Sequence, residues 1–285
     1  MLPLPRSLRF TLVAVGAMAI AGAALSPVWA QGKLEARYAA SLAGIPIGKG
    51  SWVIDITDTS YTATASGATT GLLHAFTGGE GTSAAHGTLQ AGQLPSSVYA
   101  TTITTSHKND EIQITIDNGM LKNFKVDPPQ DNDAERVPIT EAHQHGILDP
   151  MTASLLRTPG NGDPLSAEAC QVSQSIFDGR LRYDLQFAFK RMDKVKAAKG
   201  YAGPVVVCAV YFTPIAGHIP SRTAIKYIAK LRDIEIWLAP IAGTRVLVPF
   251  RLEGPTPVGH AVLEATQFIS VASPPRASAN GAKTQ

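Results

Sequence analysis

The sequence is poor in cysteine and in charged residues: 2 of its 285 residues are cysteine, and Asp, Glu, Lys and Arg make up 16%. The net charge of +3 at pH 7 gives no strongly basic surface for nucleic-acid binding. The glycine-rich stretch 79–83 lacks the lysine and the spacing of a phosphate-binding loop. The Gly-x-Ser-x-Gly elbow of a hydrolase is also absent. We therefore expect no enzymatic activity, no cofactor and no metal.

The first 30 residues have the organisation of a secretory signal peptide. Arg6 and Arg9 form a short basic region, residues 10–25 are almost wholly apolar, and residues 27–30 offer small residues to a signal peptidase. An uncleaved membrane anchor is the alternative, but the apolar run is shorter than the roughly 20 residues that a spanning helix needs. We expect cleavage after Ala30. The mature chain loses two of the 25 basic residues and none of the 22 acidic ones, so its net charge is 23 − 22 = +1.

Cys170 and Cys208 are the two cysteines of the chain. In an exported protein, two cysteines most simply form one disulfide, since without nearby spaced histidines they make a poor zinc site. The bond would close a loop of 38 residues (208 − 170). The chain-entropy model assigns such a loop an upper limit of about 4 kcal/mol. A catalytic thiol is the alternative, and a count of free thiols distinguishes the two.

The clearest strand lies at residues 180–189 and follows a turn at Asp178 and Gly179. Apolar and polar side chains alternate along it, with Leu181, Tyr183, Leu185, Phe187 and Phe189 in one set and Arg180, Arg182, Asp184 and Gln186 in the other. This period of two predicts a strand with one buried and one solvent-exposed face. A long aromatic face needs more sheet to cover it, so the sequence predicts an all-β body.

Further short runs of β-branched and aromatic residues, separated by turn residues, predict a meander of strands. They lie at residues 34–42, 52–56, 61–65, 98–105, 112–116, 120–126, 205–212, 234–238, 246–252 and 262–269. No linker-like stretch divides them, so we expect a single β domain over residues 31–272. Residues 273–285 are rich in Pro, Ala and Ser and predict a disordered tail.

One hairpin has a turn signal at residues 118–119, which are Asn and Gly. A two-residue turn would pair Ile114 with Asn123, whereas a three-residue loop with the glycine in the left-handed region would pair Ile116 with Met120. The three-residue loop keeps the apolar residues of both strands on one face. We therefore predict the three-residue loop.

Short helices are expected between the strands. Asp149 can cap a helix that begins at Pro150. Residues 69–76 are a weaker helix prediction because the segment is short and contains a glycine. Between residues 223 and 238 the spacing fits both a helix and a strand, although its end, residues 234–238, is a strand.

Four stretches in this order resemble a domain-of-unknown-function family of exported bacterial proteins. They are residues 44–48 (GIPIG), 148–155 (LDPMTASL), 177–185 (FDGRLRYDL) and 237–249, and the similarity spans roughly residues 34–269. The Phe-Asp-Gly-Arg stretch and the cysteines that flank it are also distantly similar to periplasmic β-spiral proteins associated with envelope integrity in alphaproteobacteria.

This resemblance implies a single large, strongly curved antiparallel sheet, a β-spiral or open barrel, with one or two short helices that plug or flank it. It also implies a periplasmic location and a role in cell-envelope homeostasis. The family brings no established catalytic residues, so none is carried over.

A curved sheet of this size can hold a small hydrophobic ligand in an interior cleft. Tyr183, Phe187 and Trp237 are candidates for lining it, with core packing as the alternative. Arg180 and Arg182 are candidates for binding an anion, against the alternative of weak cross-strand ion pairs.

Two further polar segments can each be interpreted either as ordinary solvent-exposed structure or as a binding site. His143 and His145 would share a face with Glu141 if that stretch were extended, but it is a polar loop without a second cluster, so we predict no metal site. Residues 190–199 contain five Lys and Arg. They fit a solvated hairpin end, or else a contact with anionic lipid or glycan.

The sequence therefore predicts a non-catalytic periplasmic β protein that supports the cell envelope by binding a lipid, a peptide or another envelope protein. We expect no nucleic-acid partner and no integral membrane segment after signal cleavage. One alternative is a scaffolding factor that acts through protein contacts at an exposed sheet edge. The other is an unrecognised envelope hydrolase.

Overall fold

The computed structural model describes residues 31–71, 78–90 and 93–273. The expected signal peptide and the expected tail beyond residue 273 lie outside the described residues, as does most of the short helix expected at residues 69–76.

Within the described residues, fifteen strands form one sheet, antiparallel except for a short parallel pair of β11 with β15. The strands are β1 (Gly32–Leu42), β2 (Ile45–Ile56), β3 (Ser60–Thr69), β4 (Glu80–Gln90), β5 (Gln93–Thr104), β6 (Asn109–Asp117), β7 (Met120–Asp127), β8 (Leu156–Arg157), β9 (Ser173–Phe177), β10 (Arg182–Lys196), β11 (Lys199–Gly200), β12 (Ala202–Ala216), β13 (Glu235–Pro240), β14 (Val246–Thr256) and β15 (Gly259–Ala272). Their order in the sheet is β7-β6-β5-β4-β3-β2-β1-β15-β14-β13-β12-β10-β9, with β8 on β14. The first and last strands are therefore neighbours.

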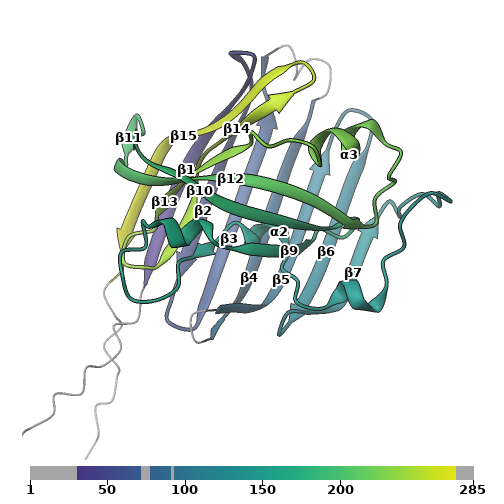
Figure 1. Cartoon of the computed structure of the whole chain (residues 1–285), viewed down its shortest axis with the longest axis horizontal. Helices are drawn as coiled ribbons and strands as arrows, with labels where there is room; N and C mark the ends of the chain where they lie inside the picture. The colour runs from purple at the N-terminus through teal and green to yellow at the C-terminus, as the bar shows by residue number, and fades with distance from the viewer. Residues whose placement is uncertain (1–30, 72–77, 91–92, 274–285) are drawn as a thin grey trace, which may run out of the picture.

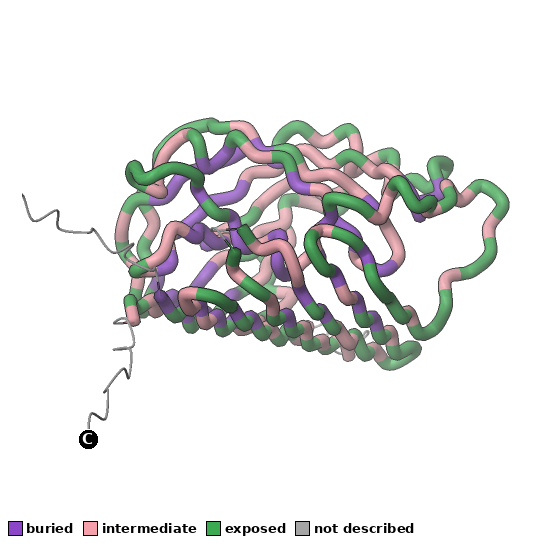
Figure 2. The backbone as a smooth tube through the Cα atoms, turned by 90° about the horizontal axis from the view of Figure 1, so that it is seen from below, coloured by how far each residue is buried: buried purple, intermediate pink, exposed green. Residues whose placement is uncertain are grey.

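The sheet curves so strongly that its two halves form layers. Figure 1 shows β1 to β7 as a broad rear layer, with β10 and β12 crossing in front of it. The view from below in Figure 2 shows buried residues interspersed with exposed ones along the strands of this curved sheet. The prediction of one large, strongly curved and open antiparallel sheet is confirmed.

Four short helices lie between the strands of the described region: η1 (Glu141–Gln144), α2 (Pro150–Ala153), η2 (Ala167–Cys170) and α3 (Thr223–Ile228). The predicted helix after Asp149 is confirmed as α2. The ambiguous stretch 223–238 divides into α3 and then β13. The helical spacing was therefore correct for the first half of the stretch, and the alternating spacing for the second half.

Whether buried and exposed residues alternate along a strand depends on whether one or both of its faces are covered. In β1, Leu34, Ala36 and Tyr38 are buried while the residues between them are exposed. By contrast, residues 205–210 of β12 form a continuous buried run. Val205 and Val207 join the inner core, whereas Val206, Cys208 and Val210 join a second cluster on the outer face. A strand covered on both faces reads as an unbroken apolar run.

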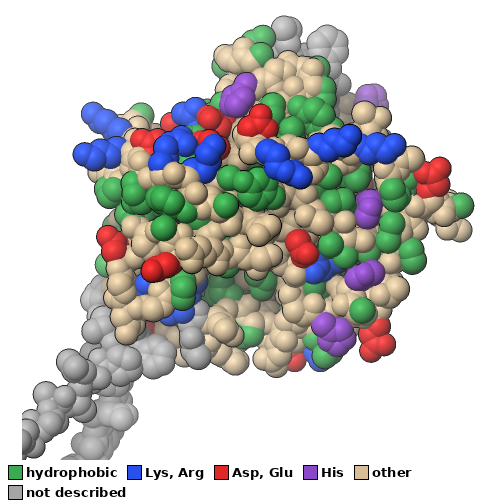
Figure 3. All heavy atoms as spheres, in the orientation of Figure 1, with side chains coloured by type: hydrophobic (Ala, Val, Ile, Leu, Met, Phe, Trp, Pro, Cys, Tyr) green, Lys and Arg blue, Asp and Glu red, His purple; other side chains and the backbone are tan. Residues whose placement is uncertain are grey.

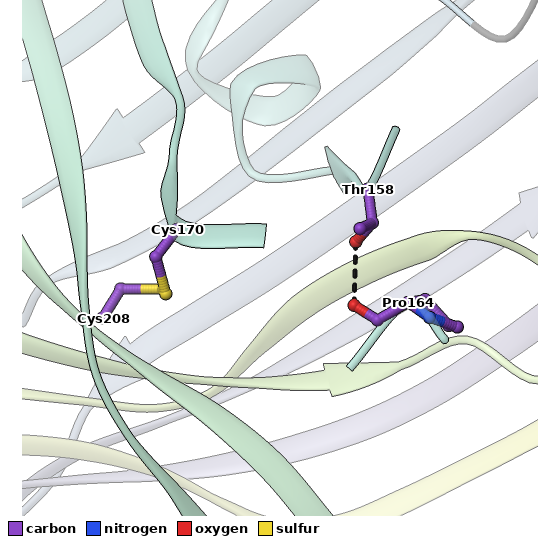
Figure 4. Close-up of a disulfide and its surroundings, with 4 residues drawn as sticks. All are labelled: Thr158, Pro164, Cys170 and Cys208. Atoms are coloured by element: carbon purple, nitrogen blue, oxygen red, sulfur yellow. Dashed lines mark hydrogen bonds between the residues drawn. A yellow bond between two sulfur atoms is a disulfide. The ribbon is translucent and has the colours of Figure 1, made fainter. Parts of the chain in front are cut away.

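The cover of that outer face is the chain from β8 to η2. Cys170 at the end of η2 forms a disulfide with Cys208 of β12, with the Cα atoms 5.5 Å apart. The Thr158 hydroxyl donates to the Pro164 carbonyl at 2.9 Å and closes the loop between them, as Figure 4 shows beside the disulfide. The predicted disulfide is therefore present, and it fastens a loop cover to the sheet.

Inside the curve, a buried polar network fixes α2 to the sheet. Asp149 is fully buried, and its Oδ1 accepts from the backbone N–H groups of Met151 and Thr152 at 3.0 and 2.9 Å. Its Oδ2 accepts from the Ser97 hydroxyl of β5 at 2.6 Å and from the Thr152 hydroxyl. Because the Thr152 hydroxyl donates to the carboxylate, the Tyr61 hydroxyl of β3 donates to Thr152. The helix cap is thus also the attachment of the helix to two strands.

The two edges of the open sheet, β7 and β9, face each other across a seam that the chain itself partly fills. The segment 145–148 forms an isolated bridge with Met120 of β7 at its start and with Ile176 of β9 at its end. Phe124 of β7 packs edge-on against Phe177 of β9, with ring centroids 5.3 Å apart. Contacts inside the molecule therefore cover part of both edges.

The predicted loop of the hairpin between β6 and β7 is wrong. Asp117 pairs with Met120, so residues 118–119 form a two-residue turn, with φ values of 50° and 71°. This turn has the twist that hairpins favour. A register shift follows and brings Ile114 opposite Phe124. The shift puts the apolar residues of the two strands on the same face, which is the result that the three-residue loop was predicted to give.

The predicted faces of the central strand are only partly correct. Arg182 is 8% exposed and Phe189 is 42% exposed, the reverse of the prediction. The register of β10 against β12 shifts at Arg182 and again between Phe189 and Arg191. Because one extra residue moves every following side chain to the other face, regular alternation in the sequence does not continue through these shifts.

Candidate functional site

An apolar cleft occupies one end of the interior. It has two connected parts of about 830 and 700 Å³, which share Ala40, Ile47, Leu252 and Leu263 as walls. Leu252 of β14 and Leu263 of β15 pair directly across the sheet, and each is 37% exposed. Each part has the size typical of small-molecule sites, roughly 300–1,000 Å³.

The first part of the cleft lies between the rear strands and α2. Trp52 and Tyr38 contribute to its walls, as do Met151 of α2 and Ser154 just after it. The Tyr38 hydroxyl donates to the Pro249 carbonyl at 2.7 Å. Trp52 is 8% exposed, and its indole Nε1 has no hydrogen-bond acceptor. A buried donor without an acceptor is costly, so this wall holds one unsatisfied polar group among apolar side chains.

The second part lies under α3. Tyr227, Ile228 and Leu231 line it from the helix side, opposite strands β14 and β15. Lys226 and Lys230, in and just after the helix, are exposed to solvent. The α3 segment is therefore amphipathic, with its apolar residues on the cleft and its lysines outside.

Few charged groups reach the cleft. Among the described lining residues, Lys49 and Glu80 stand at the first part and Glu253 at the second. Glu253 is paired with Arg251 at 2.5 Å. Burial raises the pKa of the Tyr38 hydroxyl, so this group stays neutral. The arrangement is suited to holding a molecule with long apolar parts.

The three aromatic residues predicted to line a ligand site are not on the walls of this cleft. Phe187 packs in the outer cluster and Trp237 in the inner core. Trp237 Nε1 donates to Asp193 at 2.9 Å, and this hydrogen bond lowers the pKa of Asp193. Tyr183 packs on Phe212, with ring centroids 5.2 Å apart. Core packing, the alternative interpretation, describes them better.

The two predicted anion-binding residues are each paired with a carboxylate. Arg180 donates to Asp110 of β6 at 3.1 Å and to the Pro128 carbonyl at 3.0 Å. Arg182 donates to Asp184 at 2.7 Å. Arg180 precedes β10 and Arg182 is buried, so the prediction that both lie on its outward face is wrong. Arg180 ties the turn before β10 to the rear layer.

The stretch 141–145 is not extended, so the alternation that would put His143, His145 and Glu141 on one face is absent. His143 belongs to η1, and its Nδ1 accepts from the Thr140 backbone N–H at 3.1 Å. His145 follows the helix and pairs with Met120. Over residues 31–71, 78–90 and 93–273, no group of three or more His, Cys, Asp or Glu side chains is placed to hold a metal.

Sequence reasoning missed the residues that do line the cleft. The sequence identifies Ile47 only as part of the stretch 44–48, and Leu252 and Leu263 only as positions in predicted strands. Leu252 and Leu263 lie directly opposite each other on the paired strands β14 and β15. A pairing scheme for β14 with β15 could have placed the two leucines together, but not shown that their surroundings stay unfilled.

The fold and this cleft define an open, barrel-like β protein with a hollow apolar end. The chain belongs to the family described as protein of unknown function (DUF3108), whose model matches residues 37–266. No curated protein matches the sequence. A solved structure described as a beta-barrel-like protein of domain of unknown function DUF1849 from Brucella abortus is similar at a TM-score of 0.45 with 8% identity, over 84% of this chain and 97% of that one. No helix of the described residues is long and apolar enough to cross a membrane.

Proposed function

We propose that this protein is an exported, non-catalytic periplasmic protein that supports the cell envelope by binding an amphiphilic molecule, such as a lipid, in the apolar cleft. The observation that carries the proposal is the two-part cleft joined at Ala40, Ile47, Leu252 and Leu263. The signal-like N-terminal sequence and the disulfide support export, because disulfides persist in oxidising compartments.

The chemistry of the walls supports a ligand with an acyl chain and a polar group near it. Each buried methylene contributes about 0.8 kcal/mol, so affinity should rise about fourfold per added methylene until the cleft is filled. The unsatisfied Nε1 of Trp52 suits a ligand oxygen, such as that of an ester or a carboxylate.

The test is native mass spectrometry of the mature protein purified from the periplasm, followed by solvent extraction. We expect a discrete added mass that extracts as lipid. Leu263→Glu should abolish it by placing a charge on the shared wall, whereas Val98→Glu should not. Val98 is a matched control because it is 42% exposed on β5 and away from the cleft.

An unliganded mass, together with no binding of fatty acids of increasing chain length, would contradict the proposal. A co-purifying protein without a ligand would favour the scaffolding alternative. That alternative relies on exposed sheet edges, and the segment 145–148 covers part of both edges here. The cleft is therefore the stronger basis for a function.

A further inference from the structure

Positive charge is concentrated in one stretch of this nearly neutral molecule. Residues 190–235 contain nine Lys and Arg against three Asp and Glu, a net charge of +6. The other described residues contain 12 basic and 19 acidic residues, a net charge of −7. The whole described chain therefore has no general attraction to anions, whereas this stretch has a strong local one.

The second half of β10 presents lysines and apolar residues together on its outer face. Val195 and Ala197 pack toward the inner core, so the alternate residues Met192, Lys194 and Lys196 point outward. These three are exposed, Met192 by 46%. Phe189, before the register shift, is exposed as well.

The exposed lysines of the α3 segment extend this surface. Figure 3 shows Lys and Arg side chains in a band across the front of the molecule, from the β10–β12 hairpin to α3, with hydrophobic side chains directly below it. Glu235 neutralises part of the band by pairing with Lys190 and Arg191. Within the part of the chain that the structure describes, Lys194 and Lys226 form no ion pair, so their charge is available to a partner.

We propose that this face, defined by Phe189, Met192, Lys194, Lys196, Lys226 and Lys230 and here called the basic face, docks on an anionic lipid bilayer. Lysines on flexible stems suit a fluid layer of phosphate headgroups, and exposed apolar side chains among them can enter the headgroup region. An acidic protein would use the charge but would leave Phe189 and Met192 without a role. The proposal does not depend on the cleft being occupied.

Docking through the basic face would also orient the cleft. The α3 segment carries Lys226 and Lys230 outside and Tyr227, Ile228 and Leu231 on the wall of the second part. A bilayer that holds the lysines therefore lies beside the wall of the cleft. This position suits exchange of an amphiphile between the bilayer and the protein.

The test is co-flotation of the mature, disulfide-bonded protein with vesicles of phosphatidylcholine alone or mixed with phosphatidylglycerol. We expect binding to the mixed vesicles only, and release by high salt, because salt screens exposed charges. Each lysine near an anionic surface is worth roughly a fivefold change in affinity. The variant Lys194→Glu/Lys196→Glu/Lys226→Glu/Lys230→Glu should therefore lose binding by on the order of a hundredfold or more.

The matched control is Lys33→Glu/Arg37→Glu/Lys122→Glu/Lys125→Glu, which makes the same change in net charge on strands β1 and β7 of the rear layer, lines neither part of the cleft, and should keep most of the binding. Met192→Gln should weaken binding even at low salt, since it removes the inserted side chain and no charge. Equal loss in both charge variants, or equal binding to neutral vesicles, would overturn the proposal. Binding to polyglutamate but not to mixed vesicles would assign the face to an acidic polymer instead.

Discussion

The two ends of the interior are built from the same strands but filled in opposite ways. At the packed end, Leu34 of β1 and Ile54 of β2 are fully buried in the inner core. At the hollow end, Ala40 and Ile47 of the same two strands line the cleft. The difference is what covers each strand half. At the packed end the side chains form one continuous buried core, whereas at the hollow end apolar walls face an unfilled space.

This contrast separates the residues that hold the fold from those available for a ligand. Close packing and satisfied polar groups give the packed end its rigidity. The hollow end keeps apolar surface exposed and an indole donor unpaired, and both raise its free energy unless something binds there. Substitutions of the same kind should therefore have large effects on stability at the packed end and small ones at the hollow end.

The largest effect is expected from Asp149→Ala. This change removes the helix cap and leaves the hydroxyls of Ser97 and Thr152 with no carboxylate to accept their hydrogen bonds. Losing a cap costs about 1 kcal/mol and each buried donor about 1–3 kcal/mol, so the free energy of unfolding should fall by at least about 3 kcal/mol. Urea denaturation of the oxidised protein measures it. Glu80→Ala at the hollow end removes an exposed carboxylate and should stay within about 0.5 kcal/mol; equal losses in both variants would contradict the contrast.

Loss of the disulfide should come next. Cys170→Ala/Cys208→Ala releases the loop cover from β12 and should lower the free energy of unfolding by about 2–4 kcal/mol. The disulfide belongs to the cluster on the outer face, and neither cysteine lines either part of the cleft. The variant, while folded, should therefore bind the cleft ligand with unchanged affinity. A large change in affinity would show that the outer cover also shapes the cleft.

Enlarging an alanine should distinguish the two ends directly. Ala63 of β3 is fully buried at the packed end, whereas Ala40 of β1 lines both parts of the cleft. Ala63→Leu should cost about 1–3 kcal/mol by overpacking. Ala40→Leu has open space before it and should change stability by less than about 0.5 kcal/mol, while weakening ligand binding by filling the cleft. Similar costs at both sites, from thermal or urea unfolding, would mean that the cleft closes in solution.

The packed end was partly predictable from sequence because its signals are local. Asp149 followed by Pro150 predicts a helix start from chemistry within a few residues. The partners of Asp149 on other elements, such as Ser97 on β5, are set by tertiary packing, and no pattern in the neighbouring sequence indicates them. Gly179 shows the same limit: it was read as a turn residue, but a Cβ there would come within 2.5 Å of the Ile112 side chain across the seam.

The hollow end was not predictable because an unfilled space has no sequence pattern of its own. Leu263 at the cleft and Leu34 in the core are the same residue type in similar strands, and only tertiary packing makes one 37% exposed and the other fully buried. Large aromatic residues such as Phe187 and Trp237 were chosen instead, and these are the ones that a core buries first. The register shifts of β10 were also not predictable. A bulge inserts an extra residue into one strand of a pair, and the alternating apolar and polar pattern of the sequence does not show where.

The smallest expected effect concerns an ion pair that belongs to neither end. Burial acts to raise the pKa of Glu235, but hydrogen bonds from Lys190 and Arg191 outweigh it and hold the pKa below its ordinary value of 4.5. A carboxyl with a lowered folded-state pKa contributes stability above its unfolded pKa and loses it as the pH falls through the folded value. Because both cations are more than a third exposed, the contribution should be under about 1 kcal/mol.

Glu235→Gln should therefore be slightly less stable than the unmodified protein at neutral pH, and urea denaturation over a pH series should show the difference disappearing below pH 4.5. A difference that persisted unchanged in acid would assign the effect to side-chain packing instead of charge.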